Sequence, residues 1–225
     1  HIMVVELHSE QIEIAFDSFD HLKTSPIFGD YLSHRFADVG QEIVLIAPDD
    51  GGVRAREDLH KNLRQDLIAG QASVHQLRKR RAMEEKEVLD FVGEVDGKIA
   101  IIFDDMMRSG TTMFQAASGA KKAGARKVLG VAAHFFGLDS KKHGLFEERL
   151  AESDLDELIV SNTRPAVVER LARSPILRQK LTLIDIAPYM GRAIRNYETG
   201  GTIKDMLGSL TDKRELYGVL HQAGS

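Results

Sequence analysis

The chain is predicted to form an α/β fold, with a parallel sheet that helices cover on both faces. Two observations predict it. Apolar runs of strand type recur along the chain, and segments with helical periodicity lie between them. The strand-like runs are apolar at almost every position instead of alternating, which is typical of parallel strands buried on both faces.

The elements follow from these runs in chain order. Strands are expected at Ile2–Leu7, Glu42–Ala47, Ala72–Leu77, Ile99–Phe103, Val128–His134, Glu157–Ser161 and Leu181–Ile186. Helices are expected roughly at Ile27–Phe36, Ala55–Asp66, Met113–Ala123, Phe146–Leu150, Pro165–Ala172 and Met190–Tyr197. A glycine-rich turn follows at 199–202, and the residues after Ser209 are expected to form a polar tail or a helix that needs a partner.

Composition narrows the class of protein. A formal net charge of −4 gives no general basic surface, so nucleic-acid binding is not expected. Cysteine is absent, which excludes disulfides and thiolate sites. The longest apolar stretch, Val128–Leu138, is too short to cross a bilayer, so no membrane association is expected. No signal peptide is visible, and the cytoplasm is the expected location.

The beginning of the chain is unusual. His1 and Ile2 precede Met3, and a buried strand is already under way at Ile2. An α/β domain rarely opens on such a strand, so the sequence favours a piece of a longer protein.

The most informative segment is AIIFDDMMRSGTT, residues 100–112. An apolar strand leads into two adjacent carboxylates, Asp104 and Asp105, and a small-residue turn then opens a helix. Such a turn can direct backbone N–H groups at a phosphate, and the helix start adds a positive dipole end. The carboxylates can hold sugar hydroxyls or a hydrated metal beside it. The segment therefore predicts recognition of a phosphorylated sugar.

Two other expected strands end in charged segments, and ligands bind at the carboxyl ends of parallel strands. Pro48-Asp49-Asp50-Gly51-Gly52 is either an ordinary turn or a loop whose glycines let the backbone approach a diphosphate, with Asp49 available to magnesium. Arg78-Lys79-Arg80-Arg81 is either a solvated charge run or a mobile loop that closes over transferring phosphates. His8 and His134, taken alone, are more simply explained as structural histidines.

FDDMMRSGTT resembles the 5-phosphoribosyl 1-diphosphate binding motif of the phosphoribosyltransferase fold. From Val5 to Ile194 the chain resembles the ribose-phosphate pyrophosphokinase family, with motifs in the right order and spacing. The segments that carry this resemblance are VELH at 5–8, QI at 11–12, APDDGGVRA at 47–55, KRR at 79–81, VGEV at 92–95, KAGA at 122–125 leading to His134, IVSNT at 159–163, IAP at 186–188 and AI at 193–194.

The resemblance implies a phosphoribosyltransferase-like fold and a reaction in which the C1 hydroxyl of ribose 5-phosphate attacks the β-phosphorus of MgATP, giving 5-phosphoribosyl 1-diphosphate and AMP. Lys79 and Arg81 would stabilise the transition state from a flexible loop. Mg2+ would lie at His8 and Asp49, and ribose hydroxyls at Asp104 and Asp105. The implied 5-phosphate site is Arg108, Ser109, Gly110, Thr111 and Thr112, and the implied diphosphate loop is Asp49, Asp50, Gly51 and Gly52.

The same resemblance implies how the chain is divided and what it binds. Residues 1–22 and 184–207 would be the remnant of an N-terminal-type domain, 23–183 the domain that binds ribose 5-phosphate, and 208–225 a tail. Ribose 5-phosphate and ATP would be the ligands, the protein would form a homo-oligomer, and an N-terminal half would be absent.

Three positions depart from the family pattern, which commonly has Asp at Arg108, Gly at Thr111 and Asp at Glu6. Two other functions therefore stay open. One is a catalytically silent, synthetase-associated subunit that binds phosphoribosyl ligands and regulates a partner. The other is a phosphoribosyltransferase that uses the same motif with a nucleobase, although the cations at 79–81 favour the kinase over it.

Overall fold

The computed structural model describes residues 1–38, 40, 42–49, 51–81, 84–139, 144–208 and 213–224. Its strands are β1 Ile2–Val5, β2 Phe19–Leu22, β3 Ile43–Ala47, β4 Ile68–Arg81, β5 Glu84–Val92, β6 Ile99–Met107, β7 Lys127–Phe135, β8 Glu157–Ser161, β9 Leu181–Asp185 and β10 Gly218–His221. Its α-helices are α1 Ser25–Arg35, α2 Val53–Asn62, α3 Thr111–Lys122, α4 Phe146–Glu152, α5 Ala166–Arg173, α6 Pro175–Lys180, α7 Ala187–Glu198 and α8 Ile203–Gly208. Short 3-10 helices are η1 Glu10–Ala15, η2 Gln65–Leu67 and η3 Lys213–Leu216.

The main sheet has eight described strands in the order β10-β9-β8-β7-β6-β3-β4-β5. All neighbouring pairs from β9 through β4 are parallel, whereas the two edge strands, β10 and β5, are antiparallel to their neighbours. From β3 the chain moves to β4 on one side, and β6 lies on the other side of β3. The strand order therefore reverses between β3 and β6, where α/β sheets bind their ligands.

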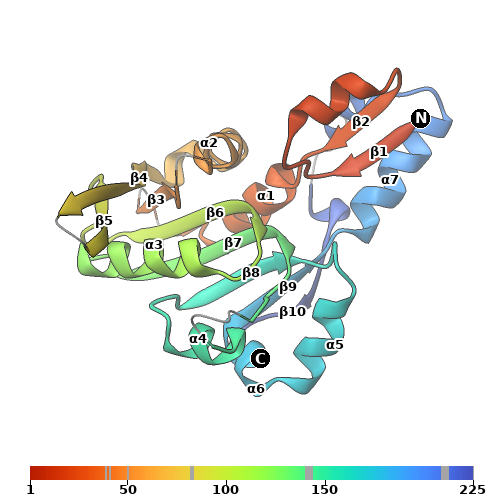
Figure 1. Cartoon of the computed structure of the whole chain (residues 1–225). Coiled ribbons are helices and arrows are strands. Elements are labelled where there is room, and N and C mark those ends of the chain that lie inside the picture. The colour runs from red at the N-terminus through yellow and green to blue at the C-terminus, as the bar shows by residue number, and fades with distance from the viewer. Residues whose placement is uncertain are drawn as a thin grey trace.

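Helices cover both faces of this sheet, as the sequence predicts (Figure 1). Ile99, Ile101 and Phe103 of β6 belong to one core, which α1, α2, α7 and α8 complete. Ala100 and Ile102 belong to the opposite core, which α3, α4, α5 and α6 complete. Because successive strand residues point to opposite faces, a strand between two helical layers must be apolar at every position. None of the described helices has the length and hydrophobicity that spanning a bilayer requires.

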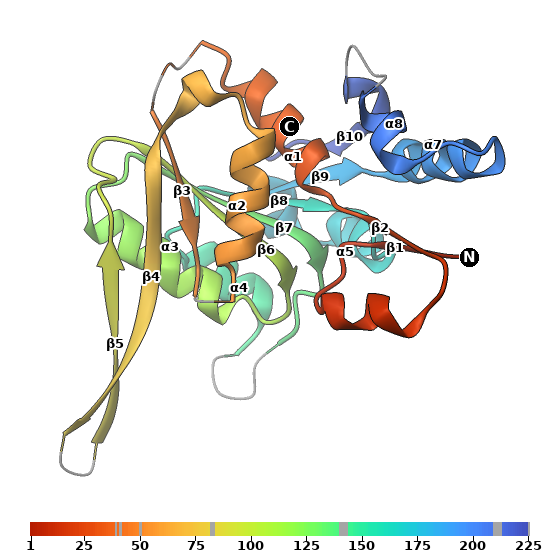
Figure 2. The same cartoon turned by 90° about the horizontal axis from the view of Figure 1, so that it is seen from above.

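The basic segment at 78–81 is the end of strand β4, and not the loop that one of the two interpretations of the sequence expects. β4 continues past the end of β3, which pairs with it only as far as Ser73, and β5 pairs with β4 up to Arg81↔Glu84. Residues 74–81 thus extend roughly 26 Å beyond the carboxyl edge of β3, at 3.3 Å per residue. Figure 2 shows this ribbon projecting from the body of the molecule.

The end of the chain is not a tail. Leu216 of η3 is 0% exposed, and β10 pairs antiparallel with β9, with Gly218 opposite Asp185. β10 is only four residues long and leaves Val219 and Leu220 largely exposed, so it lacks the continuous apolar run that marks the central strands. The expected division of the chain into units stays a prediction.

A small second sheet stands beside the main one. β1 and β2 pair in parallel, from Ile2↔Phe19 to Val5↔Leu22. The imidazole of His1 stacks on Tyr197 of α7, with ring centroids 4.0 Å apart, so β1 and α7 lie side by side (Figure 1). His134 of β7 reaches the carbonyl oxygens of Val5 and Glu6 with Nε2, at 3.1 and 2.9 Å. A histidine of the main sheet therefore holds the end of β1.

Candidate functional site

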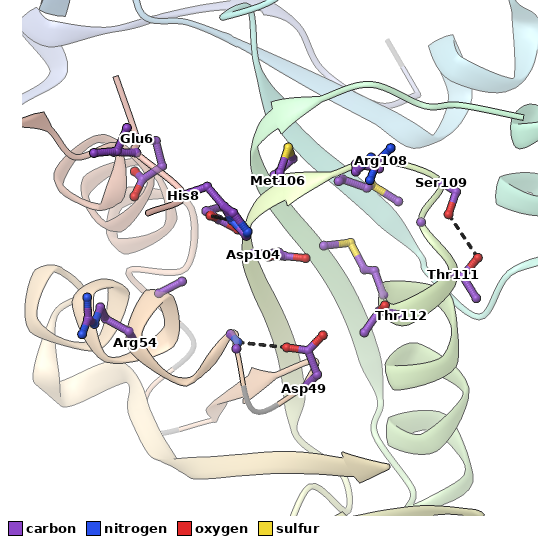
Figure 3. Close-up of a pocket in the computed structure, with 18 of the residues that line it drawn as sticks. Glu6, His8, Asp49, Arg54, Asp104, Met106, Arg108, Ser109, Thr111 and Thr112 are labelled. Carbon is purple, nitrogen blue, oxygen red and sulfur yellow. Dashed lines mark hydrogen bonds and ion pairs between the residues drawn. The ribbon is translucent and has the colours of Figure 1, made fainter. Parts of the chain in front are cut away.

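A cavity of about 690 Å3 opens at the carboxyl ends of β3 and β6, where the strand order reverses. This volume lies in the range that small-molecule sites occupy. Most of the residues predicted from the sequence line it (Figure 3), namely His8, Asp49, Gly51, Gly52, Asp104, Asp105, Arg108, Ser109, Gly110, Thr111 and Thr112. Asp50 lies outside the described residues. The small sheet supplies one wall of the cavity through residues 6–8.

The acidic pair lies within β6 instead of following it. β3 pairs with β6 only as far as Ile102, so Asp104 and Asp105 run past the end of their neighbour and face the cavity. Burial, followed by hydrogen bonding to Asp105 and repulsion from Asp105 and Asp49, raises the pKa of Asp104 to about 7. This part of the cavity therefore disfavours the ionised form of Asp104.

His8 supplies a positive group to this pair. Its Nδ1 lies 2.6 Å from Oδ2 of Asp105, and the hydrogen bond to Asp105, together with the charges of Asp105 and Asp104, raises the pKa of His8 above its usual range. The His8 side chain is 71% exposed, so it remains free to contact a ligand in the cavity.

The turn at 108–112 has the backbone geometry of an anion site. Gly110 precedes α3 with a φ of 75°, and a Cβ there would lie 2.6 Å from Met107 Cε and 2.8 Å from Phe114 Cζ. Only glycine fits both the positive φ and the lack of space for a Cβ. In the described part of the chain, no acceptor is recorded for the backbone N–H groups of residues 109–112. These donors lie at the start of a twelve-residue helix, where an oxyanion is favoured.

The turn is held from behind by a residue that sequence reasoning missed. Arg149 of α4 donates from Nη1 to the carbonyl of Ser109 and from Nη2 to Oγ1 of Thr111, both at 2.9 Å. Oγ of Ser109 lies 3.2 Å from the same Thr111 oxygen. Arg149 is 40 and 38 positions from its partners, so no local pattern in the sequence signals these contacts.

The loop before α2 forms the opposite side of the site. The backbone N–H of Gly52 donates to the carboxylate Oδ1 of Asp49 at 3.0 Å, which fixes the Asp49 side chain at the cavity (Figure 3). A Cβ at Gly52 would lie 2.6 Å from Cδ of Pro48, so the tight turn needs glycine here. The start of α2 therefore brings a carboxylate and close backbone to the same space as the acidic pair.

Two histidine contacts fix the segment that carries His8. The backbone N–H of Leu7 donates to Nε2 of His21 at 2.9 Å, and Nδ1 of His21 lies 2.8 Å from Oε1 of Glu13. Since Nε2 must accept, the proton is on Nδ1 and is donated to Glu13. Glu6, in the same segment, has a φ of 44°, a left-handed backbone conformation that is strained for a residue with a Cβ.

The remaining predicted residues differ in their placement. Arg108 is exposed at the wall of the cavity and forms no ion pair with any described residue, while its carbonyl accepts from the N–H of Leu138 at 2.8 Å. Lys79 and Arg81 are described only as backbone of the β4 ribbon, so their predicted role stays a prediction.

The chemistry of this cavity suits a cation that a ligand helps to hold. Within the described residues, no group of three acidic, histidine or cysteine side chains could enclose a metal ion. Mg2+ is usually bound by one or two carboxylates together with substrate phosphates and water. Asp49 and the His8 side chain line the cavity with Asp104, and a cation bound there would favour the ionised form of the Asp104 carboxyl.

The chain is similar in sequence to proteins of a known family. Residues 56–207 match the family model described as the phosphoribosyl synthetase-associated domain. A ribose-phosphate pyrophosphokinase of Aquifex aeolicus is 33% identical over 207 residues, covering 91% of this chain and 60% of that relative. One from Nitrosomonas europaea is 34% identical over 167 residues, covering 73% and 48%.

A solved structure is also similar to this chain. The crystal structure of phosphoribosylpyrophosphate synthetase from Mycobacterium smegmatis matches with a TM-score of 0.71 and 30% identity, over 88% of this chain and 59% of that one. The chain thus spans about half to three-fifths of the length of these relatives. On the family match and these similarities, the chain belongs to the ribose-phosphate pyrophosphokinase family.

Proposed function

We propose that this chain is the ribose 5-phosphate-binding portion of a ribose-phosphate diphosphokinase. The observation that carries the proposal is the placement of Asp104 and Asp105 beside the 109–112 turn, whose backbone N–H groups have no described acceptor. A phosphorylated sugar needs both components, since carboxylates accept from its hydroxyls and amides donate to its phosphate.

In this proposal, the 5-phosphate of the sugar binds the turn at Ser109–Thr112, and Asp104 and Asp105 accept from the ribose hydroxyls. The C1 hydroxyl then attacks the β-phosphorus of ATP, the bond from that phosphorus to the α-phosphate oxygen breaks, and AMP leaves. The departing hydroxyl proton passes to solvent or a nearby base. The loop from Asp49 to Gly52 lines the space for the transferred diphosphate.

Charge stabilisation supplies most of the catalysis in such transfers. Mg2+, when bound near Asp49 and His8, would neutralise the diphosphate oxygens. Lys79 and Arg81, at the far end of the β4 ribbon, would act on the same charge if the ribbon folds over the cavity. The adenine group of ATP needs contacts beyond those assigned to this cavity.

One observation favours a second function. Arg108 places an additional cation at the wall of the cavity, where the family commonly has an acid. A chain that binds phosphoribosyl ligands tightly and lacks catalysis would be a regulatory subunit of a synthetase. Ligand binding and turnover therefore have to be measured separately.

Calorimetric titration with ribose 5-phosphate tests the binding part of the proposal. We expect saturable binding, and Asp104→Ala is expected to weaken it at least about tenfold, because charge-assisted hydrogen bonds contribute roughly 1.5–3 kcal/mol each. Asp154→Ala, at an exposed carboxylate outside the cavity, is the matched control and should bind normally. Absence of binding by the unmutated chain would refute the proposal.

Release of AMP from MgATP and ribose 5-phosphate tests the catalytic part. Binding without AMP release favours the silent subunit, and release of pyrophosphate from 5-phosphoribosyl 1-diphosphate with a nucleobase favours a phosphoribosyltransferase. We expect weak AMP release from the chain alone, and full activity at a concentration where the chain is monomeric would contradict the idea that its ATP site is incomplete.

A further inference from the structure

We propose that Arg149 is a positioning residue of the phosphate turn, and that its guanidinium also provides positive charge behind the bound phosphate. This inference rests on the proposed function, because it assumes that the turn at 109–112 receives a phosphoryl group. The structural basis is a pair of hydrogen bonds from α4 to the turn.

The two bonds fix the turn at both of its ends. Nη1 of Arg149 donates to the main-chain oxygen of Ser109, and Nη2 donates to the Thr111 hydroxyl, each at 2.9 Å. Between these contacts lies Gly110, which has a left-handed backbone and no side chain to restrain it. The contacts use a carbonyl oxygen and a hydroxyl oxygen of the turn, so they leave the backbone N–H groups of residues 109–112 unoccupied by Arg149.

Arg149 is itself held firmly. Its helix is anchored by Phe146, which is 0% exposed and contacts the rings of Phe114 and Phe135, with centroids 5.8 and 5.3 Å away. The guanidinium carbon of Arg149 lies 5.3 Å from the centroid of Phe114, which follows the turn in α3. The planar fork of arginine can therefore donate to two acceptors while it lies near an aromatic ring, a combination that lysine cannot reproduce.

The positive charge of Arg149 lies beside the turn and is not neutralised by a described carboxylate. Among the described residues, no carboxylate forms an ion pair with it. Its two recorded acceptors are neutral oxygens, so the guanidinium keeps a net positive field next to the start of α3. A phosphate dianion in the turn would experience this field together with the helix dipole.

Thr111 has a defined part in this arrangement. A glycine at this position offers no hydroxyl, so the second bond of Arg149 depends on the threonine side chain. Two substitutions therefore separate the contributions. Thr111→Val removes the hydroxyl bond and keeps the charge of Arg149, whereas Arg149→Lys keeps the charge and loses the fork.

The experiment uses the full chain with Arg149→Gln, Arg149→Lys, Thr111→Val and Thr111→Ser. The control is Arg178→Gln, because Arg178 of α6 also donates to backbone carbonyls, at Leu171 and Ala172, and does not line the cavity. One measurement is the dissociation constant for ribose 5-phosphate by calorimetry. The other is the backbone 15N order parameters of residues 109–111 in ligand-free protein, with the melting temperature recorded for every variant.

We expect Arg149→Gln to raise the dissociation constant about tenfold and Thr111→Val about threefold, with Thr111→Ser close to the unmutated chain. Arg149→Lys should lie between Arg149→Gln and the unmutated chain. The order parameters at 109–111 should fall from about 0.85 toward 0.6 in Arg149→Gln and stay unchanged in Arg178→Gln.

Unchanged affinity and unchanged order parameters in a folded Arg149→Gln chain would overturn the inference. Affinity loss in Thr111→Ser equal to that in Thr111→Val would also count against it, since the hydroxyl would then be irrelevant. If the unmutated chain does not bind ribose 5-phosphate, the proposed function fails, and the order parameters alone then decide whether Arg149 positions the turn.

Discussion

Nδ1 of His8 lies 2.6 Å from Oδ2 of Asp105, although the two residues are 97 positions apart in the sequence. His8 follows the small β1–β2 sheet, and Asp105 belongs to a central strand of the main sheet. The contact therefore joins the two walls of the cavity through a titratable pair, and its charge state depends on pH.

The first prediction concerns this pair. Because Asp105 raises the pKa of His8, the imidazolium should persist to a higher pH than in an unfolded chain. The interaction is fully present below pH 6.5 and is lost as the pH rises through the folded pKa of His8. An NMR titration of the His8 ring should show this midpoint, and Asp105→Asn should move it back toward 6.5. An identical midpoint in Asp105→Asn and in the control Asp154→Asn would exclude the pair as the cause.

The second prediction concerns Asp104, whose pKa of about 7 is far above that of an unfolded aspartate. An acid with a raised pKa in the folded state loses stability as the pH rises from about 4 to about 7. Asp104→Asn should therefore stabilise the chain at pH 8 more than at pH 5, by up to roughly 3 kcal/mol, because about two units of the shift are titrated between these pH values at about 1.4 kcal/mol per unit. Urea unfolding at both pH values measures this difference. Parallel stability curves for the two proteins would show that Asp104 ionises normally.

The third prediction tests the ribbon. Lys79→Ala and Arg81→Ala should each lower turnover about a hundredfold, the scale of one electrostatic donor of about 3 kcal/mol, with little effect on ribose 5-phosphate affinity. Arg78→Ala and Arg80→Ala are the matched controls, because they remove one charge from the same segment. The measurements are AMP release, in whichever assembly is active, and calorimetry. Equal losses of turnover in all four variants would mean that only the total charge of the ribbon matters.

The fourth prediction concerns the end of the chain. Leu216 is 0% exposed, so Leu216→Ala should lower the free energy of unfolding by about 2–5 kcal/mol. Leu220, in the adjoining strand, is 53% exposed, and Leu220→Ala should cost less than about 0.5 kcal/mol. Denaturant unfolding of both variants gives the comparison. Similar small effects at the two positions would indicate that η3 does not pack on the core in solution.

The fold class and the central strands were predictable because burial on both faces produces continuous apolar runs. Glu157–Ser161 was predicted with its observed bounds, since every residue in it is buried. The edge strands β5 and β10 were missed for the opposite physical reason. An edge strand has fewer buried neighbours and carries charged or exposed residues, so its sequence resembles a loop.

Some residues of the candidate site were predictable from the sequence and others were not. Carboxylates and glycines at strand ends were visible because the chemistry of turns and of anion binding is local. Arg149, His21 and Glu13 were not visible, because they act through side-chain contacts set by packing. The tie from Arg149 to the turn, for example, depends on where Phe146 places α4. Positions of this type need the three-dimensional arrangement.

His134 contacts the carbonyl oxygens of Val5 and Glu6, and this contact joins the main sheet to the segment that carries one wall of the cavity. One wall of the cavity follows the small sheet and the other belongs to the main sheet, so its width depends on how one sheet is oriented to the other. A molecule that touches both His8 and the 109–112 turn therefore constrains that orientation. Its measured affinity then includes the free energy of adopting that orientation, whereas a molecule that touches one wall reports on local contacts alone.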